Sequence, residues 1–284
     1  MTVNVDRWQE IFSEKKVRFI DQRIGELKVW ESFAVDDALA ESIHQGDSAP
    51  VVRVWTHPRS VVLGIADSRL PFLIDGARWL KTQGYQPVVR NSGGLAVALD
   101  EGVLNISLLI NDQGSIGIHE GYEKMVRFMK ALLADWTDQV EAFEVVGSYC
   151  PGDYDLSIGG KKFAGISQRR IRNGIAIQIY LSVTADHQAR ARLVREFYRI
   201  GIQGEETRFD YPEVDPNVME ALETILGVTI TVDEVVEKLQ GLLDSAGLAV
   251  EQDQLTASEL KIFDKRRGLM LDRNLRALGD LFDQ

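Results

Sequence analysis

The residues best suited to covalent chemistry are the single cysteine, Cys150, and the lysine pair Lys161 and Lys162 that follows it within twelve residues. Cys150 stands in the segment Gly-Ser-Tyr-Cys-Pro-Gly, and a thiol in a loop bounded by glycine and proline can be exposed. A nearby ammonium stabilises the thiolate, which is the form that attacks carbonyl carbons. The pairing indicates acyl transfer through a thioester. The alternative is that Cys150 is a small buried apolar residue, but its polar, turn-rich surroundings favour the nucleophile.

A second group of residues lies upstream, where Arg90-Asn91-Ser92-Gly93-Gly94 separates two apolar segments. The pattern predicts a strand that delivers Arg90 into a Gly-Gly turn and a second strand that leaves it. Glycines at such a turn let the backbone approach a ligand, because no Cβ stands in the way. The same pattern is also typical of an ordinary hairpin.

Taken together, these segments resemble the lipoate-protein ligase and octanoyltransferase superfamily over roughly residues 28 to 200. In that family an Arg-x-Ser/Thr-Gly-Gly segment lines the acyl pocket, a Leu-Asn pair follows, and a Gly-Lys-Lys/Arg-hydrophobic-Ala/Ser-Gly segment carries the catalytic lysine. The matching residues are Arg90, Ser92, Gly93, Gly94, Asn105, Lys162 and Gly165. The resemblance therefore implies that Lys162 is catalytic beside Cys150 and that the other six bind the substrate.

Within the superfamily, the Ser-Tyr-Cys-Pro-Gly segment is most similar to the LipL-type octanoyltransferases. This similarity implies transfer of octanoyl from the glycine cleavage H protein to lipoyl domains of 2-oxoacid dehydrogenases, with no cofactor and no metal. The related LipM type also uses a cysteine but takes octanoyl from acyl carrier protein. Two further alternatives are an ATP-dependent lipoate ligase, in which Cys150 is incidental, and a carrier-binding protein without catalytic activity.

The chain departs from many ligases of the family at one position, because Leu99-Asp100 stands where they carry His-Asp. No role is transferred to that position. The four histidines, His44, His57, His119 and His187, show no motif that ties one of them to Cys150. His57 lies in a loop between two predicted strands and is interpreted as a surface turn residue rather than a catalytic base.

The elements that must position these residues alternate in type along the chain. Periodicity predicts helices over residues 33–43, 122–133 and 193–200, and apolar runs predict strands over 51–55, 61–63, 163–171 and 175–181. We expect 51–55 to pair with 61–63, and the last two strands to form a hairpin around the turn Asn173-Gly174. The spacings Thr231 to Glu234 and Thr256 to Glu259 are those of capping boxes, so a helix should follow each.

These patterns, together with the resemblance to the biotin and lipoate protein ligase fold, predict an α+β protein. We expect a mixed, mostly antiparallel sheet flanked by helices, in the class II synthetase-like arrangement. The predicted organisation is a catalytic domain over residues 28–250 and a helical C-terminal tail over residues 251–284.

Composition limits the function classes. The chain has 284 residues, 45% of them hydrophobic, and a formal charge of −11, which argues against nonspecific binding to nucleic acid or anionic membranes. The N-terminus has no signal-peptide pattern, and no run of about 18 apolar residues predicts a membrane span. We therefore expect a reducing cytoplasm, where a free thiol persists. A basic cluster in this acidic chain predicts either a docking surface for acidic carriers or a solvated rim: Lys161, Arg169, Arg170 and Arg172.

Overall fold

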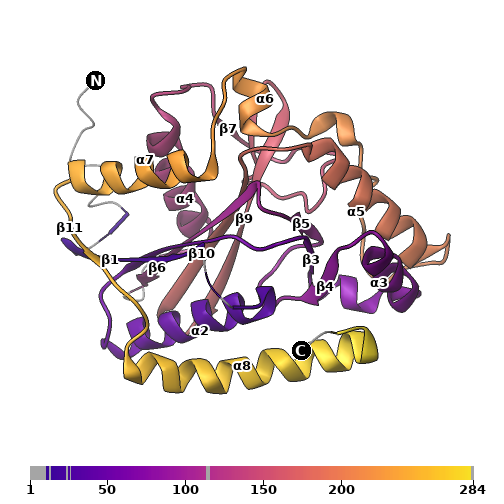
Figure 1. Cartoon of the computed structure of the whole chain (residues 1–284), viewed down its shortest axis with the longest axis horizontal. Helices are drawn as coiled ribbons and strands as arrows, with labels where there is room; N and C mark the ends of the chain where they lie inside the picture. Colours follow the sequence, from indigo (N-terminus) through magenta and orange to yellow (C-terminus); the bar gives the residue numbers. More distant parts are fainter. Residues whose placement is uncertain (1–10, 13, 24, 26, 113–115, 283–284) are drawn as a thin grey trace.

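Two sheets organise the protein, for which a computed structural model describes residues 11–12, 14–23, 25, 27–112 and 116–282 (Figure 1). The large sheet contains, side by side, β11 (Ala249–Gln252), β1 (Lys16–Gln22), β2 (Val51–Trp55), β6 (Val103–Asn111), β10 (Gly174–Ser182), β9 (Lys161–Ile171), β8 (Leu156–Ile158) and β7 (Glu141–Ala142). β1 is parallel to both of its neighbours, and the other neighbouring pairs are antiparallel. The predicted α+β class with a mixed, mostly antiparallel sheet is confirmed.

Helices cover both faces of the large sheet, whose central strands are apolar on one face and carry the buried polar side chains Arg53, Ser107 and Gln178 among apolar ones on the other. Along β6, Leu104, Ile106 and Leu108 face α4 (Ile118–Leu133) and α7 (Val232–Ser245), whereas Leu109 packs towards α2 (Val29–Gln45) on the other face. α8 (Ala257–Leu278) lies along the outer side of α2 (Figure 1). Within the described residues, no helix is both long enough and apolar enough to cross a bilayer.

The small sheet consists of β3 (Ser60–Leu63) between β4 (Gln86–Val89) and β5 (Val97–Leu99), and it packs beside α3 (Leu73–Thr82) and α5 (His187–Ile202). One predicted pairing and one alternative interpretation are therefore wrong. β2 and β3 belong to different sheets, and β4 and β5 each pair with β3 instead of with each other. Because β3 lies between β4 and β5, these two strands cannot pair with each other. The Gly-Gly segment that joins them is a wide connection across the sheet rather than a hairpin turn. The remaining short elements are η1 (Asp67–Arg69), η2 (Pro216–Val218), α6 (Leu222–Leu226) and η3 (Gly279–Leu281).

Both predicted capping boxes are confirmed. Thr231 Oγ1 accepts from the Glu234 N–H at 3.1 Å, and Glu234 accepts from the Thr231 N–H at 2.7 Å, at the start of α7. Thr256 and Glu259 do the same at the start of α8, at 3.2 and 2.8 Å. Each box satisfies two N–H groups that the first helical turn leaves without a backbone partner, so each helix begins where the spacing indicated.

Elements on both sides of the predicted 28–250 unit share its sheet and core. β1 lies before residue 28, and β11 spans the boundary at residue 250 and pairs with β1. In α8, the buried side chain of Asn274 accepts from the Val89 N–H at 2.6 Å and donates to the Val89 carbonyl at 3.1 Å. The helical tail thus fixes the backbone next to Arg90.

The predicted hairpin of β9 and β10 is present, but its turn is one residue earlier than expected. Gly174 already pairs with Ile171, so the two loop residues are Arg172 and Asn173, and Arg172 adopts the left-handed conformation with φ 53°. Gly174 is required for another reason. A Cβ at this position would lie 1.8 Å from the Ala40 carbonyl oxygen of α2.

We expect Gly174→Ala to lower the free energy of unfolding by roughly 2 to 3 kcal/mol, because α2 must move away from the sheet to admit a methyl group. Urea unfolding followed by circular dichroism measures this. Gly268→Ala in α8 is a matched control, since nothing lies within 4 Å of its Cβ position. This control should be neutral or stabilising by up to about 1 kcal/mol. Equal stability of Gly174→Ala and wild type would contradict the close approach.

Candidate active site

Cys150 occupies a strained position in the loop between β7 and β8. Its φ of 47° lies in the left-handed region, which is uncommon for a residue other than glycine. The preceding residue anchors the loop, because the Tyr149 side chain is fully buried and its N–H donates to Met219 Sδ at 3.4 Å. Cys150 itself is partly exposed. The loop therefore holds the thiol out of the core in one orientation.

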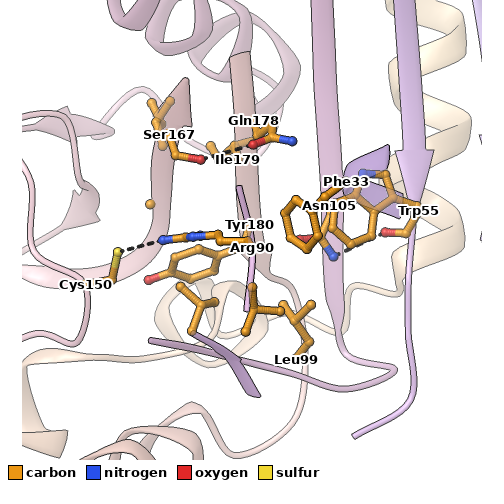
Figure 2. Close-up of a pocket in the computed structure, with 14 residues that line it drawn as sticks. Phe33, Trp55, Arg90, Leu99, Asn105, Cys150, Ser167, Gln178, Ile179 and Tyr180 are labelled. Carbon is orange, nitrogen blue, oxygen red and sulfur yellow. Dashed lines mark hydrogen bonds between the residues drawn. The ribbon is translucent and has the colours of Figure 1, made fainter. Parts of the chain in front are cut away.

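Two groups donate to the cysteine sulfur. The Leu95 N–H donates to Sγ at 3.1 Å. Arg90 Nη2 lies 3.5 Å from the same atom (Figure 2) and also donates to the Leu95 carbonyl at 2.9 Å. A guanidinium and a backbone N–H are groups that stabilise a thiolate by hydrogen bonding. Arg90 and Leu95 thus bring together the two segments that the sequence singled out.

Residue 94 must be glycine because it lies directly against both Arg90 and the sulfur of Cys150. Its φ is 93°, and a Cβ there would lie 2.4 Å from Arg90 Nη2 and 2.8 Å from Cys150 Sγ. Gly64 at the end of β3 packs against it equally closely, since a Cβ on Gly64 would lie 1.9 Å from the Gly94 carbonyl oxygen. The approach of the turn to the sulfur therefore depends on two glycines that lack side chains.

Lys162 does not contact the sulfur but holds the backbone that carries it. Its ammonium is fully buried, pairs with Asp155 Oδ1 at 2.8 Å, and donates to the carbonyls of Tyr149 at 2.9 Å and Cys150 at 2.8 Å. The sulfur's donors are Arg90 and Leu95 instead. In this geometry Lys162 fixes the conformation of the loop, and its charge is balanced by Asp155.

Asp155 was missed by sequence reasoning because no spacing marks it as a partner of Lys162. Burial raises the pKa of Asp155, and this is opposed by the charge of Lys162 and by hydrogen bonds from the N–H groups of Val145 and Gly152. Removing either member of this buried pair would leave the other charge without compensation.

A buried pair behind the Gly-Gly segment was also missed, because its members lie 131 residues apart. The Tyr198 hydroxyl donates to Asp67 at 3.0 Å and accepts from the Ala96 N–H at 3.1 Å. Asp67 also accepts from the Gly64 N–H at 2.7 Å. These bonds fix Ala96 next to Leu95, so they support the N–H that reaches the sulfur. Burial raises the pKa of Asp67 to about 6, although Gly64, Tyr198 and the charge of Arg90 act in the opposite direction.

The raised pKa of Asp67 predicts a pH dependence of stability. The carboxyl ionises near 3.8 in the unfolded chain and near 6 in the folded protein, so ionisation favours unfolding as pH rises between these values. Relative to Asp67→Asn, wild type should lose roughly 3 kcal/mol of unfolding free energy over this range. Urea titrations of both proteins from about pH 4 to 7 measure the difference. A constant difference across that range would contradict the raised pKa.

Cys150 lines one end of a narrow cavity on the α2 side of the large sheet, which encloses about 420 Å³ with its open mouth included (Figure 2). Its apolar walls come from α2 and from both sheets: Phe33, Trp55, Val62, Val97, Leu99, Ile166, Ile179 and Tyr180. The polar wall residues are Arg90, Asn105, Ser167 and Gln178. The apolar lining of this cavity suits a hydrocarbon chain whose reactive end lies at the sulfur.

Most of the substrate-binding residues expected from the resemblance lie at this cavity. Arg90, Asn105 and Gly165 line it, and a Cβ on Gly165 would lie 2.6 Å from the Tyr180 ring. Gly94 lies against Arg90 and the sulfur, as described above. Ser92 is buried and its hydroxyl has no hydrogen-bond partner among the described residues. Gly93 has open space around its Cβ position and does not line the cavity.

The structure divides the predicted basic cluster into two parts. Lys161 lies at the start of β9 and donates to the Asn217 carbonyl, while the three arginines lie at its other end, roughly 25 Å away along the strand. Arg169 pairs with Asp37 at 3.0 Å and Arg170 with Asp112 at 3.1 Å. The four residues therefore form no single positive face beside Cys150.

His57 is buried, so its interpretation as a surface turn residue is wrong. Its Nε2 lies 2.8 Å from the Ser32 hydroxyl, and burial together with the nearby charge of Arg53 lowers the pKa of His57 to about 3. It lines a different cavity from Cys150. His57 is thus a neutral structural residue near pH 7.

The fold is that of the lipoate protein ligases. The putative lipoate protein ligase from T. acidophilum with bound lipoic acid is 18% identical, with a TM-score of 0.65 and coverage of 88% of this chain and 93% of that one. A lipoate-protein ligase A bound with ATP is 19% identical, with a TM-score of 0.67 and coverage of 90% and 93%. At these identities the likeness shows the fold alone.

Sequence comparison gives the family. The lipoyl protein ligase A/B catalytic domain matches residues 28–243. A protein of Oceanobacillus iheyensis is 50% identical over 94% of this chain and 98% of its own length, and one of Geobacillus kaustophilus is 49% identical over 96% and 98%. Both are named octanoyl-[GcvH]:protein N-octanoyltransferase. The chain belongs to the lipoyl protein ligase A/B catalytic domain family.

Proposed function

We propose that this protein is an N-octanoyltransferase that moves octanoyl from GcvH, the glycine cleavage H protein, to lipoyl domains of 2-oxoacid dehydrogenases. The names of the near full-length relatives support the reaction and the donor. The observation that carries the proposal is the position of Cys150, whose sulfur accepts from two donors at one end of an apolar cavity. An acyl chain in this cavity places its carbonyl at the thiolate.

The first half of the reaction forms a thioester. The Cys150 thiolate attacks the octanoyl amide carbon, the carbon–nitrogen bond breaks, and the lysine nitrogen of the carrier takes one proton from solvent and leaves as the amine. The Leu95 N–H lies 3.1 Å from Sγ, so it can follow the negative charge from the sulfur to the developing oxyanion. Arg90, 3.5 Å from the sulfur, favours the anionic nucleophile.

The second half regenerates the enzyme. The lysine amine of the acceptor attacks the thioester carbon and loses one proton, and the thiolate leaves as the carbon–sulfur bond breaks. One amide is consumed and one is made, so the exchange is nearly isoenergetic and needs no ATP. Burial of the octanoyl tail at about 0.8 kcal/mol per CH₂ provides several kcal/mol of chain recognition in the apolar cavity.

A comparison of donors tests the proposed function. Purified enzyme and an apo lipoyl domain are incubated in parallel with octanoyl-GcvH, with octanoyl-acyl carrier protein, and with octanoate plus ATP. We expect octanoyl transfer from octanoyl-GcvH without ATP, at a rate well above the other two. Transfer only from acyl carrier protein would identify the LipM-type activity, and transfer only with ATP would identify a ligase. Either result would overturn the proposed donor.

A docking role for the basic residues near the turn of β9 and β10 remains a prediction. Arg172 is exposed at the turn, and the described residues give it no ion pair, so its charge can be reversed without breaking an internal contact. If this face attracts acidic carriers, Arg172→Glu should raise the KM for octanoyl-GcvH a few-fold and weaken its salt dependence. Acylation by a small octanoyl thioester serves as the control. An unchanged KM would show that the turn is a solvated rim.

A further inference from the structure

A second cavity lies beside the active site on the opposite face of the large sheet. It encloses about 650 Å³ with its open mouth included, between the start of α4 and the loop that follows Cys150. Its lining residues are Ile118, His119, Tyr122, Gly152, Asp153, Tyr154, Asp155 and Ile166. Neither the catalytic steps above nor the acyl cavity uses its aromatic and carboxylate side chains.

The two cavities meet at the edge of β9. Gly165 and Ser167 face the acyl cavity on the α2 side, whereas Ile166 packs towards α4 and lines both cavities. Beyond Ala164, β9 pairs with β10 alone among the described strands, so its other edge is free where the Cys150 loop lies. A group in the second cavity can thus approach the sulfur around this edge without crossing the sheet.

Tyr122 connects the second cavity to the sulfur electrostatically. Burial raises the pKa of Tyr122, and the charges of Cys150 and Asp153 raise it further while Arg90 opposes them. Gly152 and Asp153 also follow Cys150 within three residues in the chain. The cavity therefore lies near the sulfur, on the face of the sheet opposite to the acyl cavity.

The walls suit one kind of side chain. Tyr122 and Tyr154 stack with ring centroids 4.9 Å apart and an interplanar angle of 5°, and His119 Nδ1 lies 3.1 Å from the Tyr154 hydroxyl. Aromatic surfaces of this kind cover an aliphatic stem and attract a cation. The exposed carboxylate of Asp153 stands at the rim. A primary amine on a flexible aliphatic stem is the ligand that matches both features.

We propose that this cavity receives the carrier's lysine side chain in both halves of the reaction. The proposal rests on the proposed function, because it assigns the route of the amine to the thioester at Cys150. With the octanoyl tail held on the α2 side, the lysine stem lies between Ile166 and the two tyrosines and brings its nitrogen to the carbonyl carbon. In the second half the amine gives up its proton to solvent at the open mouth.

Asp153→Lys and Tyr154→Ala test the proposal. Asp153→Lys puts a cation where the ammonium enters, and Tyr154→Ala removes one aromatic wall. Matched controls are Asp47→Lys, which changes an exposed aspartate after α2, and Tyr85→Ala, which changes a half-buried tyrosine before β4. Two rates are measured for each protein: acylation of Cys150 by the small donor octanoyl-N-acetylcysteamine, and transfer from the acylated enzyme to an apo lipoyl domain.

We expect the KM for the lipoyl domain to rise about tenfold in both test variants. The rate of Cys150 acylation by the small donor should stay close to that of wild type. The controls should match wild type in both rates. A lipoyl-domain KM unchanged in Asp153→Lys, with normal acylation, would overturn the lysine route and leave the proposed function standing. Failure of wild type to become acylated by any octanoyl donor would instead remove the proposed function itself.

Discussion

Cys150→Ala is expected to abolish octanoyl transfer while leaving the fold intact. The side chain is only partly buried, and its hydrogen-bond partners are the Leu95 N–H and Arg90, so truncation removes the nucleophile and a small part of the packing against the core. We expect the rate to fall by at least about 10³-fold, because no other thiol exists in the chain to form the acyl intermediate. Transfer of octanoyl from octanoyl-GcvH to a lipoyl domain measures the loss.

Cys150→Ser serves as the matched control for this loss. It keeps the size of the side chain and the hydrogen bonds to Arg90 and Leu95, but a hydroxyl is far less acidic than a thiol and a poorer nucleophile. Its activity should stay close to that of Cys150→Ala, while the urea unfolding midpoints of both variants match wild type. Turnover at the wild-type rate in Cys150→Ala would rule out a cysteine intermediate.

Lys162→Met is expected to cause the second large loss, through the loop rather than through the sulfur. It leaves the carboxylate of Asp155 buried without its cation and removes the donors to the carbonyls of Tyr149 and Cys150. Loss of one partner of a buried ion pair costs roughly 3 to 5 kcal/mol of unfolding free energy. The transfer rate should fall at least about a hundredfold, because Cys150 is no longer held in its left-handed conformation.

Two further variants separate this explanation from a general effect of losing a lysine. Lys161→Met changes an exposed neighbour and should affect stability by less than about 0.5 kcal/mol. Lys162→Met combined with Asp155→Asn should recover part of the stability, since the unpaired charge is gone, but little of the activity. If Lys162→Met were as stable as wild type, the buried pair would not have the role that the geometry gives it.

Local sequence patterns predicted the elements well where their causes are local. The two capping boxes placed the starts of α7 and α8, because side chains three residues apart satisfy the helix N-terminus on their own. The hairpin of β9 and β10 was also predicted, but its turn is displaced by one residue. Gly174 is glycine because of α2, and a contact with a helix more than a hundred residues away leaves no trace in a turn pattern.

Strand pairing was predicted less well, because it depends on elements distant in sequence. The expected pair of β2 with β3 fails, and so does the alternative of an ordinary hairpin between β4 and β5, since β3 lies between β4 and β5 in a separate sheet. Alternation of apolar residues shows which face of a strand is buried but not which strand lies beside it.

In the candidate site, too, residue types and spacing were predictable from the sequence, whereas contacts between distant residues were not. Resemblance located Cys150, Arg90 and Gly94 by residue type and spacing, and the structure brings all three together. It could not show that Arg90 and Leu95 contact the sulfur while Lys162 binds the loop, because these are matters of side-chain geometry. Asp67, Tyr198 and Asp155 had no motif to mark them, since their roles arise from burial and long-range hydrogen bonds.

The most direct test of the central claim is intact-protein mass spectrometry of the enzyme after brief exposure to octanoyl-GcvH without acceptor. A thioester at Cys150 predicts a mass increase of about 126 Da on wild type, removed by hydroxylamine or by an apo lipoyl domain. Peptide mapping should place the octanoyl group on Cys150, and Cys150→Ala should show no increase. An unmodified wild-type enzyme that nevertheless transfers octanoyl once an apo lipoyl domain is added, or an octanoyl group on another residue, would contradict the account.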